Sequence, residues 1–144
     1  MKTEILTILH EQTGFVSGQA LCEQLGVSRT AIWKVMKQLK KEGYEIESVQ
    51  NKGYRLIQIP DIISPSEIKS RLQCSFVGQE IKYQKETGST NTDAKQLAEE
   101  GYPNGTLVLA DRQRMGRGRR GRVWESVEGR NLYFSLLLRP EIQP

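Results

Sequence analysis

The sequence predicts an α+β chain of two modules, one at residues 1–62 and one at residues 63–144. Two patterns indicate the first module: apolar residues recur at helical spacing in three short segments, and two β-prone runs follow them. A stretch with two prolines, Ile57–Pro65, then separates a second half in which β-prone runs flank a single amphipathic helix. Each element is predicted from its own residues, as follows.

The first two helices are short. Apolar residues at helical spacing predict a helix over residues 3–12, which Gly14 should end in a left-handed conformation. Ser17 can cap a second helix over Gly18–Leu25, because its hydroxyl can accept a hydrogen bond from a free N–H group of the first turn.

The third helix is predicted over Arg29–Lys41, with Ser28 as its cap. Its buried stripe recurs at i, i+3, i+4 and i+7 and consists of Ile32, Val35, Met36 and Leu39. The β-prone runs Glu45–Val49 and Tyr54–Ile59 follow, and the Asn and Gly between them favour a hairpin turn. Three helices and a hairpin are the winged helix-turn-helix arrangement.

A helix-turn-helix whose third helix is basic on its outer face suits double-stranded DNA, which we predict as its partner. The predicted contacts are Ser28, Arg29, Thr30, Trp33, Lys34, Lys37 and, at the tip of the wing, Lys52. Two alternatives stay open, because a basic helix face is often simply solvated and three-helix units also bind proteins. For Trp33 the alternative is that it completes the helix packing.

Composition excludes several classes of protein. The chain has 144 residues, a net charge of +4 and 26% charged residues, which is typical of a globular protein and not of a disordered one. Its apolar runs are too short to span a bilayer, and no signal peptide is evident, so we expect a cytoplasmic protein without membrane partners. Two distant cysteines, Cys22 and Cys74, and a single histidine, His10, predict neither a disulfide framework nor a metal site. We expect His10 to have no particular partner.

The second module begins after the proline-containing linker. We expect a helix from Ser66 to about Leu72, with Ser66 as its cap, and a later helix after the polar turn at residues 86–91. The predicted strands are Glu80–Lys85, Thr106–Ala110 and Leu132–Arg139.

The most informative segment lies between the last two strands and contains six arginines and three glycines but no acid between Arg112 and Arg122. A guanidinium group can donate hydrogen bonds to two phosphate oxygens at once, and glycines allow the backbone to approach a ligand closely. Such a loop fits a clamp for nucleotide phosphates in an α/β enzyme, ordered by its anionic ligand. RNA binding and a merely solvated loop are the alternatives, whereas a Walker-type loop is excluded because no Gly-Lys-Ser/Thr ending is present.

The run from Gln113 to Trp124, preceded by Ser89-Thr90-Asn91 and followed by Asn131-Leu-Tyr-Phe-Ser-Leu, resembles the ligand-binding core of biotin–protein ligases. The winged helix in front, ending in Lys52-Gly-Tyr-Arg-Leu, resembles the bifunctional bacterial members that also repress biotin genes. The fold class implied is a winged helix-turn-helix at 1–62 followed by the opening part of a mixed α/β biotin-ligase catalytic domain at 63–144.

The resemblance also implies site residues. Biotin contacts fall on Ser89, Thr90, Asn91 and Gln113, and the adenylate-binding loop falls on Gly116, Arg117, Gly118, Arg119, Arg120, Gly121 and Arg122. Arg119 corresponds to the arginine that retains the reactive adenylate and is the implied catalytic residue, and Trp124 packs beside the adenine. The implied cofactors are biotin, ATP and Mg²⁺ carried by the nucleotide, with no metal held by the protein itself.

The implied activity is formation of biotinyl-5′-AMP and transfer of the biotinyl group to a lysine of a carboxylase carrier domain. Implied partners are operator DNA, that carrier domain and a second copy of the protein in a ligand-induced homodimer. A different class of function is a transcription regulator that senses an adenylated effector without ligating it. Because the family's catalytic domain continues beyond residue 144, we expect this chain to be a fragment or a truncated product, with ligase activity belonging to the full-length protein.

Overall fold

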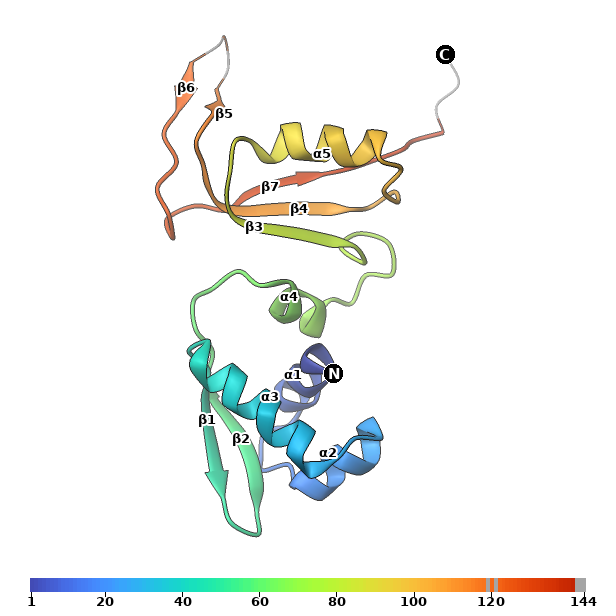
Figure 1. The fold of residues 1–144 in the computed structure, drawn as a ribbon, viewed down its shortest axis with the longest axis vertical. Coiled ribbons are helices and arrows are strands. Elements are labelled where there is room, and N and C mark those ends of the chain that lie inside the picture. The colour runs from blue at the N-terminus through green and yellow to red at the C-terminus, as the bar shows by residue number, and fades with distance from the viewer. Residues whose placement is uncertain (119, 121, 142–144) are drawn as a thin grey trace. The chain divides into compact units, whose positions relative to one another are not determined.

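In the computed structural model, which describes residues 1–118, 120 and 122–141, the chain forms two compact units (Figure 1). Unit 1 comprises Met1–Ile62 and Ser66–Arg71, and unit 2 comprises Ile63–Pro65 and the chain from Leu72 onward. The elements of unit 1 are α1 (Lys2–Glu11), α2 (Gly18–Leu25), α3 (Arg29–Lys41), β1 (Glu45–Val49), β2 (Gly53–Gln58) and α4 (Pro65–Arg71). Those of unit 2 are β3 (Ile81–Thr87), α5 (Thr90–Glu99), β4 (Leu107–Gln113), β5 (Gly116–Arg117), β6 (Val123–Trp124) and β7 (Tyr133–Leu136).

The caps of α2 and α3 are the serines that the sequence predicts. The Ser17 hydroxyl accepts a hydrogen bond from the backbone N–H of Ala20 at 3.0 Å, and Ser28 accepts one from Ala31 at 3.2 Å. The prediction for the end of α1 is wrong. The residue that caps the helix, Gln12, has an extended conformation, and Gly14 does not adopt a positive φ. A left-handed glycine, φ 64°, instead ends α2 at Gly26.

The wing is an antiparallel β1–β2 hairpin, and the α1–α2 connection adds one isolated β-bridge to its β2 strand. Val16 pairs with Tyr54 through two backbone hydrogen bonds of 2.8 Å. The neighbouring Gly53 has φ 108°, and a Cβ added to it would lie 2.0 Å from the carbonyl oxygen of Val16. Gly53 therefore permits both the turn and the close approach of the two segments.

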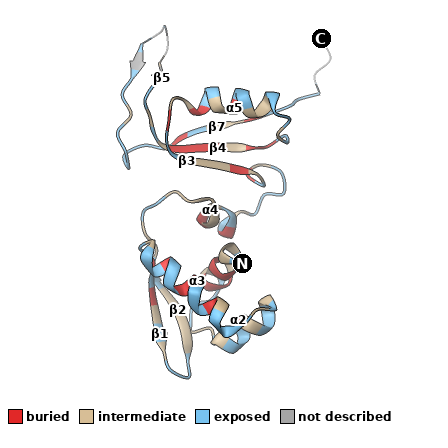
Figure 2. Ribbon diagram, viewed as in Figure 1, coloured by how far each residue is buried: buried red, intermediate tan, exposed pale blue. Residues whose placement is uncertain are grey.

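The core of unit 1 lies between α1, α2, α3 and the inner face of the wing, where buried residues line the helices (Figure 2). Its best-buried members are Ile5, Leu6, Leu21, Ile32 and Leu39. The predicted stripe of α3 is fully confirmed, since all four of its apolar side chains are buried. Cys22 is partly buried against this core, as a small apolar residue would be.

Helix α4 packs on unit 1 through Glu67, whose side chain is only 11% exposed. The Tyr44 hydroxyl donates to Glu67 Oε2 at 2.8 Å, and His10 Nε2 and Arg71 Nε lie 3.1 and 2.8 Å from Oε1. The expectation that His10 has no particular partner is therefore wrong. The helix also begins at Pro65, so Ser66 lies inside its first turn and is not its cap.

Unit 2 is a three-stranded sheet in the order β3-β4-β7, in which β3 and β4 are parallel and β7 is antiparallel to β4. Helix α5 connects β3 to β4 and lies along β4 and β7 (Figure 1). Val108, Ala110 and Tyr133 are buried in this unit. Strand β4 is longer than predicted and continues to Gln113, because Glu86 and Thr87 of β3 pair with its polar end.

The other face of the sheet carries residues that alternate with those beneath α5. Phe134, next to Ser135 on β7, is 55% exposed, and Leu132 and Leu138 are exposed as well. Among the described helices, none is both long and apolar enough to cross a membrane.

Candidate functional sites

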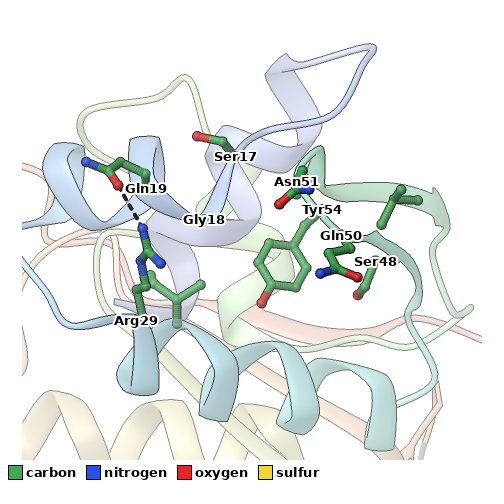
Figure 3. A pocket seen from close by; sticks show the side chains of 11 residues that line it. Ser17, Gly18, Gln19, Arg29, Ser48, Gln50, Asn51 and Tyr54 are labelled. Atoms are coloured by element: carbon green, nitrogen blue, oxygen red, sulfur yellow. Dashed lines mark hydrogen bonds between the residues drawn. The ribbon is translucent and has the colours of Figure 1, made fainter.

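Unit 1 contains a cavity of about 450 Å³ between the start of α2, the start of α3 and the wing (Figure 3). Arg29 enters it from the first turn of α3 and donates a hydrogen bond to Gln19 Oε1 at 2.8 Å. Gln50 and Asn51 reach it from the tip of the wing, and the Tyr54 ring stands between the wing and α3 (Figure 3). The cavity thus presents one guanidinium and several amide groups to whatever occupies it.

A second hollow of about 530 Å³ continues along α3 and shares Ser48 and Tyr54 with the first. Its lining includes three lysines, Lys37, Lys40 and Lys41. No carboxylate lines either hollow within the described residues. Together they form a groove between α3 and the wing, here called the basic groove, whose charge favours a polyanion.

Four of the predicted DNA contacts are exposed side chains on one flank of α3: Arg29, Trp33, Lys34 and Lys37. The Trp33 ring is 54% exposed, and Lys37 Nζ lies 5.0 Å from its centroid. This exposure contradicts the alternative that Trp33 completes the packing of the helices. Arg29, Lys34 and Lys37 form no ion pair with the described part of the chain, so their charges remain available to a partner.

The other predicted contacts lie at the ends of this surface. Ser28 uses its hydroxyl as the cap of α3, while Thr30 is exposed in the first turn. At the wing, Lys52 Nζ lies 6.0 Å from the centroid of the Phe15 ring and Arg55 Cζ lies 4.8 Å from it. Phe15 therefore braces two cations of the wing.

Sequence reasoning missed several residues of the basic groove. Lys40 and Lys41 belong to the same acid-free run as Lys37 and could have been included on that ground. Asn51 and Tyr54 carry no such signal, because only the fold of the wing brings them opposite α3.

The candidate ligand site of unit 2 forms where β4 ends and α5 begins. Gln113 Oε1 accepts two hydrogen bonds from Thr90, one from the backbone N–H at 2.8 Å and one from the hydroxyl at 3.1 Å. The Thr90 hydroxyl also lies 3.0 Å from Ser135 Oγ on β7. The structure thus brings together two residues predicted from separate segments and adds Ser135, which sequence reasoning missed.

The other predicted biotin contacts flank this cluster. Ser89 is partly buried just before α5, and its side chain makes no cap hydrogen bond, while Asn91 is exposed. The segment from Arg112 to Arg122 is here called the arginine loop. The turn before α5 is joined to its start, since Arg114 N–H donates to the Thr87 carbonyl at 2.9 Å and Met115 N–H donates to that of Gly88 at 2.8 Å. The two halves of the candidate site are therefore joined by backbone.

The arginine loop is a hairpin made by β5 and β6. Gly116 is buried opposite Trp124, and a Cβ on it would lie 3.3 Å from the Trp124 Cβ. Gly118 N–H donates to the carbonyl of Arg122 at 2.7 Å, and Arg120 takes a positive φ of 58°. Trp124 is 54% exposed and offers a flat apolar surface.

Arg119 and Gly121 lie outside the described residues, as does the side chain of Arg117. Arg120 and Arg122 are exposed and form no ion pair with the part of the chain that is described.

The first two arginines of the run share one acidic partner, which offsets one of their two positive charges. Arg112 Nη1 lies 3.5 Å and Arg114 Nε 3.2 Å from the carboxylate of Glu86, which pairs with Arg112 across the parallel strands. The segment contains no acid in the sequence, but in the folded unit the carboxylate of Glu86 from β3 lies beside it. One positive charge of the pair remains at the base of the loop, and the other four arginines of the run follow Met115.

Metal-binding groups are not gathered anywhere in the described residues, where no cluster of three His, Cys, Asp or Glu side chains occurs. Beside the site, the Tyr83 hydroxyl donates to Asp111 Oδ2 at 2.7 Å. Burial and this carboxylate raise the pKa of Tyr83 to about 12.

Comparisons with known proteins match both units. Residues 2–55 match an HTH domain, and residues 81–144 match the Biotin/lipoate A/B protein ligase family. The chain is 50% identical over 136 residues to a protein of Bacillus spizizenii and 49% identical to one of Bacillus subtilis, both named bifunctional ligase/repressor BirA. A protein of the same name from Escherichia coli is 35% identical over 130 residues.

The alignments with the two Bacillus proteins cover 93% of this chain and 42% of each relative. The alignment with the Escherichia coli protein covers 90% of this chain and 39% of that relative. The chain therefore spans about two fifths of the length of these relatives. One similar solved structure is titled as a biotin protein ligase from Aquifex aeolicus in complex with biotin and ATP. Its sequence is 46% identical to this chain, the match covers 44% of this chain and 25% of the Aquifex chain, and the TM-score is 0.36.

The resemblance seen in the arginine loop and the winged helix is thus confirmed, as is the predicted fold class. An HTH domain is thus followed by a biotin/lipoate ligase domain, and over 93% of its length the chain is similar to part of two proteins named as both ligase and repressor.

Proposed function

We propose that the full-length protein is an ATP-dependent biotin–protein ligase that also represses biotin genes. The observation that carries the proposal is the presence of an HTH domain and a biotin/lipoate ligase domain in one chain that is 50% identical to a relative named as both ligase and repressor. This combination favours ligation over a regulator that only senses an adenylated effector. It also gives the arginine loop a role other than RNA binding.

The first half-reaction joins biotin to ATP. A carboxylate oxygen of biotin attacks the α-phosphorus, the bond to the bridging oxygen breaks, and pyrophosphate leaves with the bonding electrons, which yields biotinyl-5′-AMP. Negative charge builds on the phosphate oxygens, and fixed guanidinium groups stabilise it. We assign this role to Arg117, Arg119, Arg120 and Arg122, with Arg119 retaining the adenylate and Trp124 beside the adenine.

The second half-reaction transfers the acyl group. The Nε atom of a lysine on a carboxylase carrier domain attacks the anhydride carbonyl and loses its proton, and AMP leaves. Enclosure of the anhydride by the loop would keep water away until that lysine arrives. Ser89, Thr90, Asn91 and Gln113 would bind the biotin ring and its carboxylate, because hydroxyl and amide groups suit a small polar ring.

Mg²⁺ fits this site as a companion of the nucleotide. The described residues gather no carboxylate cluster to hold it, whereas ATP phosphates bind it readily. When bound, it would neutralise phosphate charge alongside the arginines. We further propose that the ligand-loaded protein forms a homodimer, which would present two winged helices to an operator.

For DNA, we propose that α3 enters the major groove with Arg29, Thr30 and Trp33 toward the bases. Lys34, Lys37 and Lys52 would bind flanking phosphates, and one strand of the duplex would follow the basic groove. The uncompensated charge of Arg29, Lys34 and Lys37 supports this placement. A protein that binds operator DNA and a cytosolic carrier would work in the cytoplasm.

The full-length protein tests the proposal in three measurements. We expect biotin-dependent exchange of pyrophosphate into ATP, biotinylation of a purified carrier domain, and binding to the biotin operator that strengthens with biotin and ATP. Binding of a non-hydrolysable biotinyl-AMP mimic without AMP formation would instead establish an effector sensor. Salt-sensitive binding to single-stranded RNA without any effect of biotin would establish the RNA-binding alternative.

A further inference from the structure

We propose that Ser135 is a positioning residue of the biotin site. It fixes the hydroxyl of Thr90, and Thr90 in turn fixes the side-chain amide of Gln113 so that Gln113 offers only N–H donors to the ligand. The inference rests on the proposed function, because it assigns Gln113 a contact with biotin. It gives a role to the serine of the Asn131-Leu-Tyr-Phe-Ser-Leu segment, to which the sequence assigned none.

The direction of each hydrogen bond in the cluster follows from the groups present. The backbone N–H of Thr90 can only donate, so the atom of Gln113 that lies 2.8 Å away must be the carbonyl oxygen. The Thr90 hydroxyl has a single proton and lies 3.1 Å from the same oxygen, which can only accept. That proton is therefore committed to Gln113.

The Thr90 oxygen must then accept from Ser135, 3.0 Å away. The hydrogen bonds therefore run from Ser135 to Thr90 and from Thr90 to Gln113, and the donor and the acceptor of each are fixed. Thr90 is only 3% exposed, so water has little access to replace a missing partner of its hydroxyl. Ser135 itself is held by β7, where it pairs with Val108 on the central strand β4.

The consequence for Gln113 is a fixed polarity. With Oε1 occupied by two donors on the α5 side, Nε2 turns toward the start of the arginine loop, where a Cβ on Gly116 would lie 3.5 Å from it. The amide thus presents two N–H groups beside the loop. It suits a ligand acceptor such as the carbonyl oxygen of a cyclic urea, and it disfavours a ligand donor at that point.

Replacement of Ser135 by alanine removes the donor to a buried oxygen and allows the Thr90 hydroxyl to rotate away from Gln113. We expect S135A in the full-length protein to weaken biotin binding, measured by calorimetry, by about tenfold. The KM for biotin should rise by a similar factor, while kcat at saturating biotin stays within about twofold. S135T retains the hydroxyl and should restore binding.

A double-mutant cycle separates positioning from general destabilisation. If Ser135 acts through Gln113, then Q113A with S135A should bind biotin as weakly as Q113A alone, because the second change has nothing left to position. T106V is the matched control, since it removes another buried hydroxyl, which donates to the Pro103 carbonyl at 2.7 Å at the opposite end of β4. It should lower the melting temperature without changing the affinity for biotin.

The outcomes distinguish the two proposals. Normal biotin binding by both the wild type and S135A, or additive effects in the cycle, would overturn the role of Ser135 and leave the proposed function standing. An equal loss of affinity in T106V would also overturn it, because the effect would then be structural. A wild-type protein that binds no biotin would overturn the proposed function and this inference with it.

Discussion

Three glycines of unit 1 should respond to replacement by alanine in a graded way, because the structure places a different demand on each. Gly14 has no atom within 4 Å of an added Cβ and no positive φ. Gly26 has the same open space but a φ of 64°. Gly53 combines a φ of 108° with a Cβ position only 2.0 Å from the carbonyl oxygen of Val16.

The expected free energies follow from these differences. G14A should raise the free energy of unfolding by about 0.4–1 kcal/mol, because alanine restricts the unfolded chain. G26A should lower it by about 1–2 kcal/mol, the strain of a left-handed alanine. G53A should have two costs: backbone strain of about 1–3 kcal/mol, and the loss of both Val16–Tyr54 hydrogen bonds, each worth about 0.5–1.5 kcal/mol. It should therefore lower the free energy of unfolding by about 2–6 kcal/mol.

Urea unfolding of the chain measures the series. The two tryptophans lie in different units, so a W124F background leaves Trp33 as the reporter of unit 1. G53A should also weaken operator binding by the full-length protein, because the wing loses its attachment to the α1–α2 connection. A G53A midpoint equal to that of G26A would refute the reasoning, since the close approach of Val16 would then cost nothing.

Three further predictions concern charge and burial. R29A combined with K34A should weaken operator binding and reduce the slope of log affinity against log salt by about 0.9 for each phosphate that the variant no longer neutralises. Fluorescence anisotropy at several salt concentrations measures this slope. An unchanged slope would mean that this flank of α3 is a solvated surface that does not contact DNA. E67A should destabilise unit 1 by about 2–4 kcal/mol in urea unfolding, because the buried Tyr44 hydroxyl loses its 2.8 Å acceptor. Because the pKa of Tyr83 is raised to about 12 in the folded state, its contribution to stability is complete below pH 10 and lost as the pH rises toward 12. Y83F should remove this alkaline loss in pH-dependent unfolding, and a curve identical to that of the wild type would contradict the assignment.

The parts of the fold that follow from local signals could be predicted from the sequence. The serine caps of α2 and α3 and the apolar stripe of α3 depend on residues within one or two turns, and all are present in the structure. The conformation of Gly14, predicted to be left-handed, could not be judged in this way. Whether a glycine after a helix adopts positive φ depends on the direction that the next segment takes, and here the chain extends to pair Val16 with Tyr54.

Interactions between distant segments account for the other differences. His10 and Glu67 are 57 positions apart, so neither residue carries a local sign of the other. Ser135 lies among apolar residues of a strand, where a polar residue at alternate positions ordinarily indicates a solvated face. Only the placement of α5 over that face turns its hydroxyl into part of the site.

The arginine segment shows how strand register assigns roles that composition cannot. In sequence, six arginines appear equivalent, and no acid lies among them. Parallel pairing places Glu86 of β3 opposite Arg112, so one carboxylate pairs with the first two guanidinium groups, offsets one of their two charges and anchors the base of the loop. Within the described hairpin, Arg120 and Arg122 form no ion pair, and we expect an anionic ligand to offset the charge of this part of the loop. Removal of Glu86 would therefore add net positive charge at the base of the loop and leave the charge beyond Met115 unchanged, so the number of arginines alone does not give the charge that the hairpin would present to a ligand.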